Sequence, residues 1–381
     1  MTTPESVRAQ RSGEARGWQA ETLRDPAVLI SLAAEWDDLY ERCPSATAFL
    51  SSAWLLSWWR SYGERGRLAV VTVRHGGTLV AAAPLIRRRR YGVPVLTTIG
   101  AGISDFTDIL VADGYAEEGG RRLAEELAGR HRWHTIDLPE VPEDAAAWHL
   151  VAAWPAPVRR VRGSVCLELP ARPVDELIRT LPRPTAKTRR AKQRKITALG
   201  IETRIVPADQ AAQGAETLVR LHRRQWRGRG MNPEHGRPRF AAHLAGALPA
   251  MVAQGRAVLV EHRWNSAPAA VELLIGGHRA IGAYLYGFRP ELRERIDVAQ
   301  LLFAADLDIA RSRGRSTLSL LRGDEPYKRQ WRPREAPNQR VLLPARGFPP
   351  AVLYIAAVLG RRRLATIVKS HLRRFRPHSR R

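Results

Sequence analysis

The apolar positions in the first half of the chain predict two helices followed by a meander of strands. Apolar residues at helical spacing predict one helix beginning at Asp25-Pro26 and a second that carries Trp54 and Trp58. Alternating apolar positions on either side of His75-Gly76-Gly77 predict a β-hairpin. The remaining predicted elements of this half are strands at 95–99, 109–111, 135–138 and 165–169 and a helix at 117–129.

The second half of the chain repeats this order. Asp297 is predicted to cap one of its helices. Repetition of one order of elements predicts two tandem copies of an α/β (α+β) fold, each with a mixed, mostly antiparallel sheet flanked by helices. The predicted elements are, in order, a strand at 201–206, helices at 211–227 and 238–254, strands at 257–262, 269–275 and 280–288, a helix at 298–313 and a strand at 316–321.

Changes in composition divide the chain into five parts. The predicted parts are a disordered leader at 1–17, an N-terminal domain at 18–182, a basic helical connector at 183–200, a C-terminal domain at 201–345, and a basic, partly apolar tail at 346–381.

The charge of the chain restricts its partners less than its size suggests. The net charge is +25, and such an excess usually indicates an anionic partner. Almost all of it is arginine, however, which is typical of a high-GC coding bias, so an isolated lysine such as Lys328 is the more informative residue. With two cysteines and no apolar run near the ~20 residues of a spanning helix, the sequence predicts neither a disulfide framework nor a membrane span. We expect no metal and a cytoplasmic location, with a peripheral position at the inner face of the plasma membrane as an alternative.

Five short segments carry a resemblance to a known family. Together they are similar to the CelD/BcsL-type acetyltransferases of the GNAT superfamily, named after bacterial cellulose biosynthesis and distantly related to FemAB-type transferases. The similarity extends over residues 36–343. The segments are Ala-Pro-Leu at 83–85, Ile-Gly-Ala-Gly-Ile-Ser-Asp-Phe-Thr-Asp at 99–108, Leu-His-Arg-Arg-Gln-Trp at 221–226, Tyr-Leu-Tyr-Gly-Phe at 284–288 and Arg-Gly-Asp-Glu-Pro-Tyr-Lys-Arg-Gln-Trp at 322–331.

The resemblance implies tandem GNAT-like acyl-CoA N-acyltransferase folds and transfer of an acyl group, normally acetyl from acetyl-CoA, to an amine or hydroxyl. The acceptor would be a small molecule or a glycan, in envelope polysaccharide or natural-product biosynthesis. The family binds the CoA pyrophosphate on a glycine-rich turn at a helix start, and here that stretch is 295–300, without glycine. Residues expected at the acyl-CoA are Tyr286, Phe288, Arg293, Arg295 and Gln300.

Four residues are candidates for catalysis, each with a structural alternative. Lys328 would stabilise an oxyanion, or it is a surface lysine. Asp324 would orient Lys328 or act as a base, or it closes a turn, and Tyr327 would protonate the leaving thiolate. Glu272, among apolar neighbours, would be a general base, or it faces outward from an alternating strand.

Four further residues are candidates for binding the acceptor. Asp105 and Asp108 would bind a cationic amine or serve as acid and base, or they cap helices and close turns. Tyr284 and Trp226 would line the substrate pocket, or they pack the core.

Two other functions stay open from the sequence. One is an aminoacyl-tRNA-dependent, FemAB-like transferase, since phosphate contacts would suit the basic segment at 183–200. The other is a non-catalytic module that binds membrane or nucleic acid. In all cases we expect the tail from Gly347 to lie on an anionic membrane surface, unless it is a solvated tail.

Overall fold

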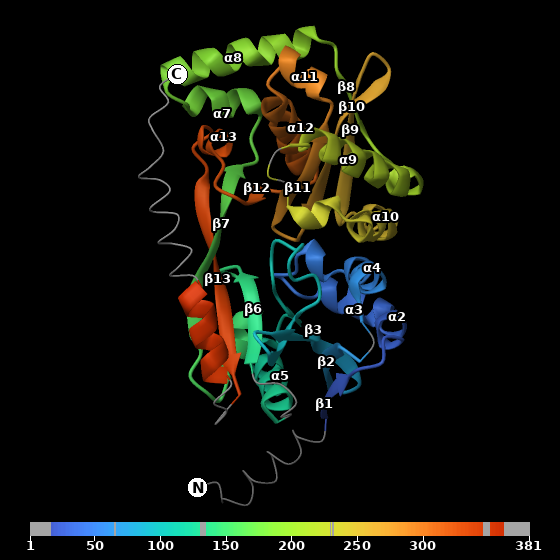
Figure 1. Cartoon of the computed structure of the whole chain (residues 1–381), viewed down its shortest axis with the longest axis vertical. Coiled ribbons are helices and arrows are strands. Elements are labelled where there is room, and N and C mark those ends of the chain that lie inside the picture. The colour runs from blue at the N-terminus through green and yellow to red at the C-terminus, as the bar shows by residue number, and fades with distance from the viewer. Residues whose placement is uncertain are drawn as a thin grey trace, which may run out of the picture.

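A single sheet runs through the whole molecule in the computed structural model, which describes residues 17–64, 66–129, 135–228, 230, 232–345 and 351–361. The 13-stranded sheet has the order β1-β2-β3-β4-β6-β13-β7-β12-β11-β10-β9-β8, with β5 paired to β3. The N-terminal half forms one end of the molecule and the C-terminal half the other (Figure 1). The fold is therefore mixed α/β with a mostly antiparallel sheet flanked by helices, as the sequence predicted.

The N-terminal half contains the predicted helices and hairpin at nearly the predicted positions. The helix predicted from Asp25 is interrupted at Leu32, and β1 was not predicted. The elements of this half are β1 (Trp18–Leu23), α2 (Val28–Ser31), α3 (Ala33–Glu41), α4 (Ser52–Tyr62), β2 (Leu68–His75), β3 (Thr78–Arg90), β4 (Val93–Thr98), β5 (Leu110–Val111), α5 (Ala116–Gly129), β6 (Thr135–Val141), α6 (Ala147–Ala152) and β7 (Arg159–Pro170).

The C-terminal half begins with a helical passage that contains the predicted basic helix as α8. Its elements are α7 (Val174–Thr180), α8 (Arg183–Ala198), β8 (Glu202–Ile205), α9 (Ala211–Gln225), α10 (Pro238–Ala253), β9 (Ala257–Trp264), β10 (Ala267–Gly276), β11 (Ala280–Phe288), α11 (Pro290–Arg295), α12 (Val298–Ser312), β12 (Thr317–Arg322), α13 (Pro326–Arg329) and β13 (Arg334–Pro344).

The two halves exchange their last strands. β7, the last strand of the first half, pairs with β12 of the second, while β13, the last strand of the second half, pairs with β6 of the first. β7 and β13 also pair with each other along most of their length. The exchange joins the halves through main-chain hydrogen bonds, so each half depends on a strand of the other.

Strand β13 was not predicted because apolar and polar residues do not alternate along its sequence. The prediction ended the second half at the strand at 316–321, and only Val341, Leu342 and Leu343 of β13 form an apolar run. The register of β13 against β7 shifts between Pro337 and Gln339. Proline and a bulge both interrupt a period of two, and the exchanged strand gains its stability from two neighbours rather than from its own pattern.

Helices α4 and α10 hold the halves together on one side of the sheet. Ser57 on α4 donates a hydrogen bond to the carbonyl of His243 on α10, with an O···O distance of 2.7 Å. A side chain at Gly246 would place its Cβ 2.7 Å from Ser57 Oγ, so glycine allows the close approach. The Trp54 ring packs edge-on against His243 in the same contact.

A last helix, at residues 351–361, packs on the N-terminal half beside β13 and is drawn in red in Figure 1. Among the described residues, no helix is long and apolar enough to cross a bilayer.

Candidate active site

The candidate site opens where two parallel strands of the C-terminal half separate. The ladder between β11 and β12 has three pairs, from Ala280–Thr317 to Gly282–Ser319, and ends there. Just beyond it, Leu321 has a left-handed backbone with φ of 52°, which turns the end of β12 away from β11. Separation of the strands exposes the edge of β11 to a cavity.

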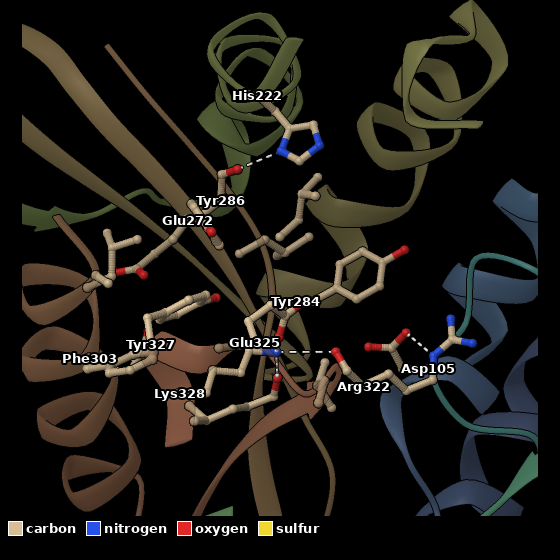
Figure 2. A pocket seen from close by; sticks show the side chains of 18 of the residues that line it. Asp105, His222, Glu272, Tyr284, Tyr286, Phe303, Arg322, Glu325, Tyr327 and Lys328 are labelled. Atoms are coloured by element: carbon tan, nitrogen blue, oxygen red, sulfur yellow. Dashed lines mark hydrogen bonds and ion pairs between the residues drawn. The ribbon is translucent and has the colours of Figure 1, made fainter. Parts of the chain in front are cut away.

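The cavity holds about 190 Å³ and is lined from both sides of the sheet. Figure 2 shows its side chains, which come from β10, β11, α9, α12 and the segment around α13. The sequence-predicted residues that line it are Asp105, Trp226, Glu272, Tyr284, Tyr286, Tyr327 and Lys328. Seven of the predicted residues, far apart in the chain, therefore meet at one cavity.

Glu272 lies in a buried group of acids without a cationic partner. Its carboxyl and that of Asp306 on α12 are both buried and interact directly, and burial raises the pKa of Glu272 to about 8. Burial and the neighbouring Glu272 together raise the pKa of Asp306 well above its usual range. Two adjacent buried carboxyls cannot both ionise, so the pair retains a proton near neutral pH. The alternative that Glu272 faces outward from its strand is wrong because the carboxyl is buried.

A histidine connects this pair of acids to an exposed residue at the protein surface. His262 Nε2 lies 2.9 Å from Glu272 Oε1, and its Nδ1 lies 2.9 Å from Oγ1 of Thr203, an exposed residue on β8. Burial lowers the pKa of His262 to about 4, so the ring is neutral at pH 7 and has one donor and one acceptor nitrogen. The chain from Thr203 to His262 to Glu272 is continuous and can carry a proton between the cavity and the surface.

Lys328 is buried at the end of β12, and its ammonium group is fully engaged. Nζ donates to the carbonyls of Leu320, at 3.0 Å, and Arg322, at 3.2 Å, and forms an ion pair with Glu325 at 2.9 Å. An ammonium group has three N–H donors, so none remains for a substrate oxygen in this arrangement. The alternative of a surface lysine is wrong, and the geometry makes Lys328 the residue that holds the turned end of β12 beside the cavity.

Aromatic residues form the rest of the wall. Tyr286 and Tyr327 approach each other through their hydroxyls, and burial raises the pKa of both. Tyr327 therefore keeps its proton and can act as a hydrogen-bond donor. Trp226 has a buried indole N–H without a hydrogen-bond partner in the described structure, which leaves a donor for a ligand. His222 Nδ1 lies 2.7 Å from the carbonyl oxygen of Tyr286, which fixes the strand against α9.

The N-terminal half reaches the cavity through one loop. Asp105 forms an ion pair with Arg322, at 2.6 Å between Oδ1 and Nε, and desolvation by burial raises its pKa despite the arginine. The hydroxyl of Tyr284 donates to the carbonyl of Ile103, at 2.8 Å. These two contacts connect the loop to the ends of β11 and β12, and the Asp105–Arg322 pair is seen at the right of Figure 2.

Six of the predicted residues do not line the cavity, and three of these are Asp108, Asp324 and Phe288. The Asp108 carboxylate is buried and accepts hydrogen bonds from the backbone N–H groups of Ile109, Ala146 and Ala147, so it closes turns instead of binding an acceptor. Asp324 is exposed and pairs with Arg329, outside the residues that line the cavity. Phe288 is buried in an apolar cluster beside the cavity.

The predicted pyrophosphate site does not fit its ligand. The Asp297 side chain accepts from the N–H of Gln300, confirming the predicted N-cap, and Arg189 and Lys192 of α8 bind the other carboxylate oxygen, at 3.2 and 2.6 Å. The Gln300 amide is buried and donates to the carbonyl of Arg189. An internal anion and a covering helix thus occupy the start of α12, which corrects the assignment of Gln300 to the acyl-CoA. The other two predicted charges, Arg293 and Arg295, are exposed on α11.

A second, larger groove adjoins the cavity. It holds about 650 Å³ and shares Leu321 with it. Its charged residues are Glu143, Asp144 and Glu168 with Arg279 and Arg334, and its floor carries hydroxyl and amide side chains. These polar residues are Ser45, Thr47, Ser316, Thr317, Ser319 and Asn338. The groove is therefore not cationic, although the chain as a whole is.

Sequence reasoning missed several residues of the site. Asp306 and His262 are an acid in an apolar helix face and a histidine in a strand, and only their pairing with Glu272 distinguishes them. Arg322 stood inside a quoted motif, beside Asp324, without an assigned role. Its position at the end of a predicted strand could have marked Arg322 as a candidate site residue.

Comparison with known proteins agrees with this geometry at the level of the fold. Residues 183–329 match the model of a family described as an acetyltransferase (GNAT) domain. FemX superimposes with a TM-score of 0.58 at 12% identity, covering 81% of this chain and 95% of FemX. The C-terminal domain of a protein assigned as a lysylphosphatidylglycerol synthetase from Agrobacterium fabrum gives a TM-score of 0.55 at 12% identity, covering 87% and 97%. L-PGS from Bacillus licheniformis gives 0.50 at 10%, covering 81% and 96%.

No curated protein sequence matches the chain. At the identities of the solved structures the likeness concerns the fold alone. In the described residues no group of three or more His, Cys, Asp or Glu side chains could hold a metal ion. The chain thus has a GNAT-like α/β fold, and its C-terminal half contains the segment that matches the GNAT acetyltransferase domain.

Proposed function

We propose that the cavity between β11 and β12 catalyses acyl transfer from an activated carboxyl donor to an amine or hydroxyl acceptor, with Glu272 as the general base. The observation that carries the proposal is the buried pair of Glu272 and Asp306. The pKa of Glu272 is about 8, and both residues line the cavity within the segment that matches the GNAT domain. A general base works best with a pKa near the working pH, and desolvation supplies that shift here.

In this mechanism each group of the cavity has one task. The acceptor attacks the donor carbonyl and transfers its proton to Glu272, from which His262 can pass it toward solvent. In the described ladders β11 pairs with β10 beyond Gly282 but no longer with β12, so backbone N–H groups on its β12 edge can donate to the carbonyl oxygen as negative charge develops on it. As the acceptor bond forms, the bond between the carbonyl carbon and the leaving group breaks. Tyr327 donates a hydrogen bond to the departing group, which takes its proton from solvent, and Lys328 keeps the end of β12 in place.

The larger groove supports an acceptor that is neutral or cationic. It adjoins the cavity at Leu321 and presents carboxylates together with hydroxyl and amide groups. Such a surface can hydrogen-bond a polyol or an aminosugar, while a polyanion would meet Glu143, Asp144 and Glu168. A glycan or small-molecule acceptor, as in the CelD/BcsL-type resemblance, belongs to this proposal.

For the donor we favour an acyl-CoA because of the matched domain. The start of α12 does not offer the usual place for the pyrophosphate, so we expect its charge to be met by the exposed Arg293 and Arg295. The test is calorimetry with acetyl-CoA and longer acyl-CoAs. Arg293→Glu with Arg295→Glu should abolish binding, while the matched control, Arg190→Glu with Arg194→Glu on the exposed face of α8, should retain it. Absence of binding of any acyl-CoA at millimolar concentration would exclude this donor.

A second candidate donor is an aminoacyl-tRNA, favoured by a specific observation. Helix α8 covers the start of α12 with Arg189 and Lys192 and exposes five further basic side chains. They are Arg183, Lys187, Arg190, Arg194 and Lys195. If tRNA is the donor, the Arg190 and Arg194 reversals should weaken binding most, and affinity should fall steeply with salt.

A further inference from the structure

Exposed apolar side chains gather at the end of the N-terminal half, far from the candidate active site. Tyr91, Val352, Leu353 and Leu359 are exposed by 53, 66, 68 and 37%. The first follows β3 and the others lie on the helix at 351–361 (Figure 1). Among the described residues the other strongly exposed large apolar side chains are Ile30 and Ile205, which belong to other elements. Scattered exposed apolar residues are ordinary, whereas a cluster indicates an interaction surface.

The inner face of the 351–361 helix packs on the sheet, so its outer face is exposed to solvent. Tyr354, Ile355 and Val358 pack with Val95 and Leu342 in one buried cluster. The hydroxyl of Tyr354 also donates to Asp137, at 2.5 Å. Both faces of this helix are therefore apolar, and the sheet covers one of them.

Tyr91 lies against this helix. Its ring centroid lies 6.0 Å from that of Tyr354, and its hydroxyl lies 3.3 Å from Nη1 of Arg361. A tyrosine with an exposed ring and a hydroxyl held by arginine is typical of the boundary between an apolar phase and water.

Arginines lie beside the apolar patch. Arg159 at the start of β7 is exposed and pairs in register with Leu342, the residue of β13 that packs against the helix. Arg361 is exposed at the end of the helix itself. From residue 346 to residue 381 the sequence contains many arginines and no acidic residue.

We propose that this end of the molecule docks on an anionic lipid bilayer, with Val352, Leu353 and Tyr91 in the interface and the neighbouring arginines at the lipid phosphates. A polyanion in water, such as a nucleic acid, would use the arginines but gain nothing from the exposed apolar side chains. A bilayer surface uses both, since apolar side chains enter the headgroup region while nearby basic residues are attracted to the anionic lipids. The inference concerns a different surface from the acyl-transfer cavity and does not depend on it.

Co-sedimentation with vesicles tests the proposal. The full-length protein should bind vesicles of phosphatidylcholine with phosphatidylglycerol and bind pure phosphatidylcholine vesicles at least 10-fold more weakly. Val352→Asp with Leu353→Asp should reduce binding to the anionic vesicles at least 10-fold. The matched control, Ile30→Asp with Ile205→Asp, places the same charges at exposed apolar positions elsewhere and should bind as the wild type does. Deletion of the tail is a poor test because it removes the buried Tyr354.

Three results would overturn the proposal. Equal vesicle binding by the Val352/Leu353 variant and its control shows that the patch is not in contact with lipid. Wild-type binding to a short duplex DNA with the affinity seen for vesicles, unchanged in the variant, assigns the arginines to nucleic acid. A wild-type dimer in light scattering that becomes monomeric in the variant assigns the patch to self-association. Circular dichroism of both variants should match the wild type.

Discussion

Each half of the molecule contains a buried carboxyl group beside a gap between parallel strands, but the surroundings of the two carboxyl groups differ. In the N-terminal half, β4 and β6 pair only at Val95–Thr135 and Leu96–Ile136, and Asp137 is buried next to this short ladder. Arg340 binds the carboxylate of Asp137 with two nitrogens, at 2.7 and 2.5 Å, and Tyr354 donates a further hydrogen bond. Arg90 lies 3.6 Å away. The buried carboxylate is paired with arginine and hydrogen-bonded at both oxygens, as a structural ion pair requires.

The C-terminal half leaves its buried carboxyls without such partners. In the described structure neither Glu272 nor Asp306 forms an ion pair with arginine or lysine, and Asp306 Oδ1 has no hydrogen-bond partner. Their gap remains a cavity, while the gap in the first half is closed by a loop whose Thr107 N–H donates to the carbonyl of Glu140. The same architecture thus gives a neutralised, closed site in one half and a protonatable, open one in the other, and only the second is suited to proton transfer.

The largest effect is expected from removing the base of the open site. Glu272→Gln keeps the size of the side chain but cannot accept a proton, so kcat should fall by about 10²–10⁴-fold, the usual contribution of a general base. Steady-state kinetics with the donor found by calorimetry measures it. Asp137→Asn in the closed site is the matched control and should leave kcat within a few fold.

The rate should also depend on pH in a way that Glu272 determines. Because its pKa is about 8, the active, ionised form increases as pH rises from 6 to 9, and the wild-type kcat should rise with it. A residual rate in Glu272→Gln that kept the same rise would assign the titration to another group.

A smaller effect on rate, with a clear effect on stability, is expected at Lys328. Lys328→Ala leaves the carbonyls of Leu320 and Arg322 buried without their donor, which costs about 1–3 kcal/mol for each unsatisfied group. Displacement of the end of β12 should lower kcat as a consequence. Urea unfolding and kinetics should therefore change together, while Lys187→Ala on the exposed face of α8 should change neither. Loss of activity at unchanged stability would instead favour a direct role at an oxyanion.

The buried acids should also make stability depend on pH. Glu272 has a folded-state pKa of about 8, above its ordinary value of 4.5, so its contribution to stability is fully present below pH 4.5 and is lost as pH rises toward 8. The free energy of unfolding of the wild type should fall between pH 5 and pH 9 more than that of Glu272→Gln. Parallel curves for the two proteins would contradict the raised pKa.

The sequence predicted most of the elements but only part of this contrast. Periodicity located the helices and hairpins, and the residues at 322–331 indicated the end of β12 as a site. Glu272 could be singled out because a carboxylate among apolar residues is conspicuous. Its partners could not, since Asp306, 34 residues further along, and His262 are ordinary in their own elements. A pattern along one element contains no information on which side chains meet across a sheet.

The same limit explains the errors. Asp105 and Asp108 are three residues apart and look alike in the sequence, yet one faces Arg322 of the other half and the other closes a turn within its own. The start of α12 had the features of an anion site, but the helix that covers it comes from residues about 100 positions earlier. Strand exchange and long-range ion pairs depend on tertiary packing, which overrides local signals.

The smallest expected effect lies in the closed site, and it tests whether that site is only structural. Tyr354→Phe removes the hydroxyl that donates to Asp137 while the ring stays buried and Arg340 keeps both of its hydrogen bonds. The variant should lose about 0.5–1.5 kcal/mol in the free energy of unfolding, the usual net value of one hydrogen bond, as measured by urea titration. Its kcat and KM should equal those of the wild type, because the side chain contacts no residue of the open cavity. Arg340→Ala should cost more, about 3–5 kcal/mol, since it leaves a buried carboxylate with too little compensation. A fall in kcat for Tyr354→Phe comparable to that of Glu272→Gln would mean that the N-terminal half also takes part in the reaction, and the contrast between the two gaps would no longer separate structure from function.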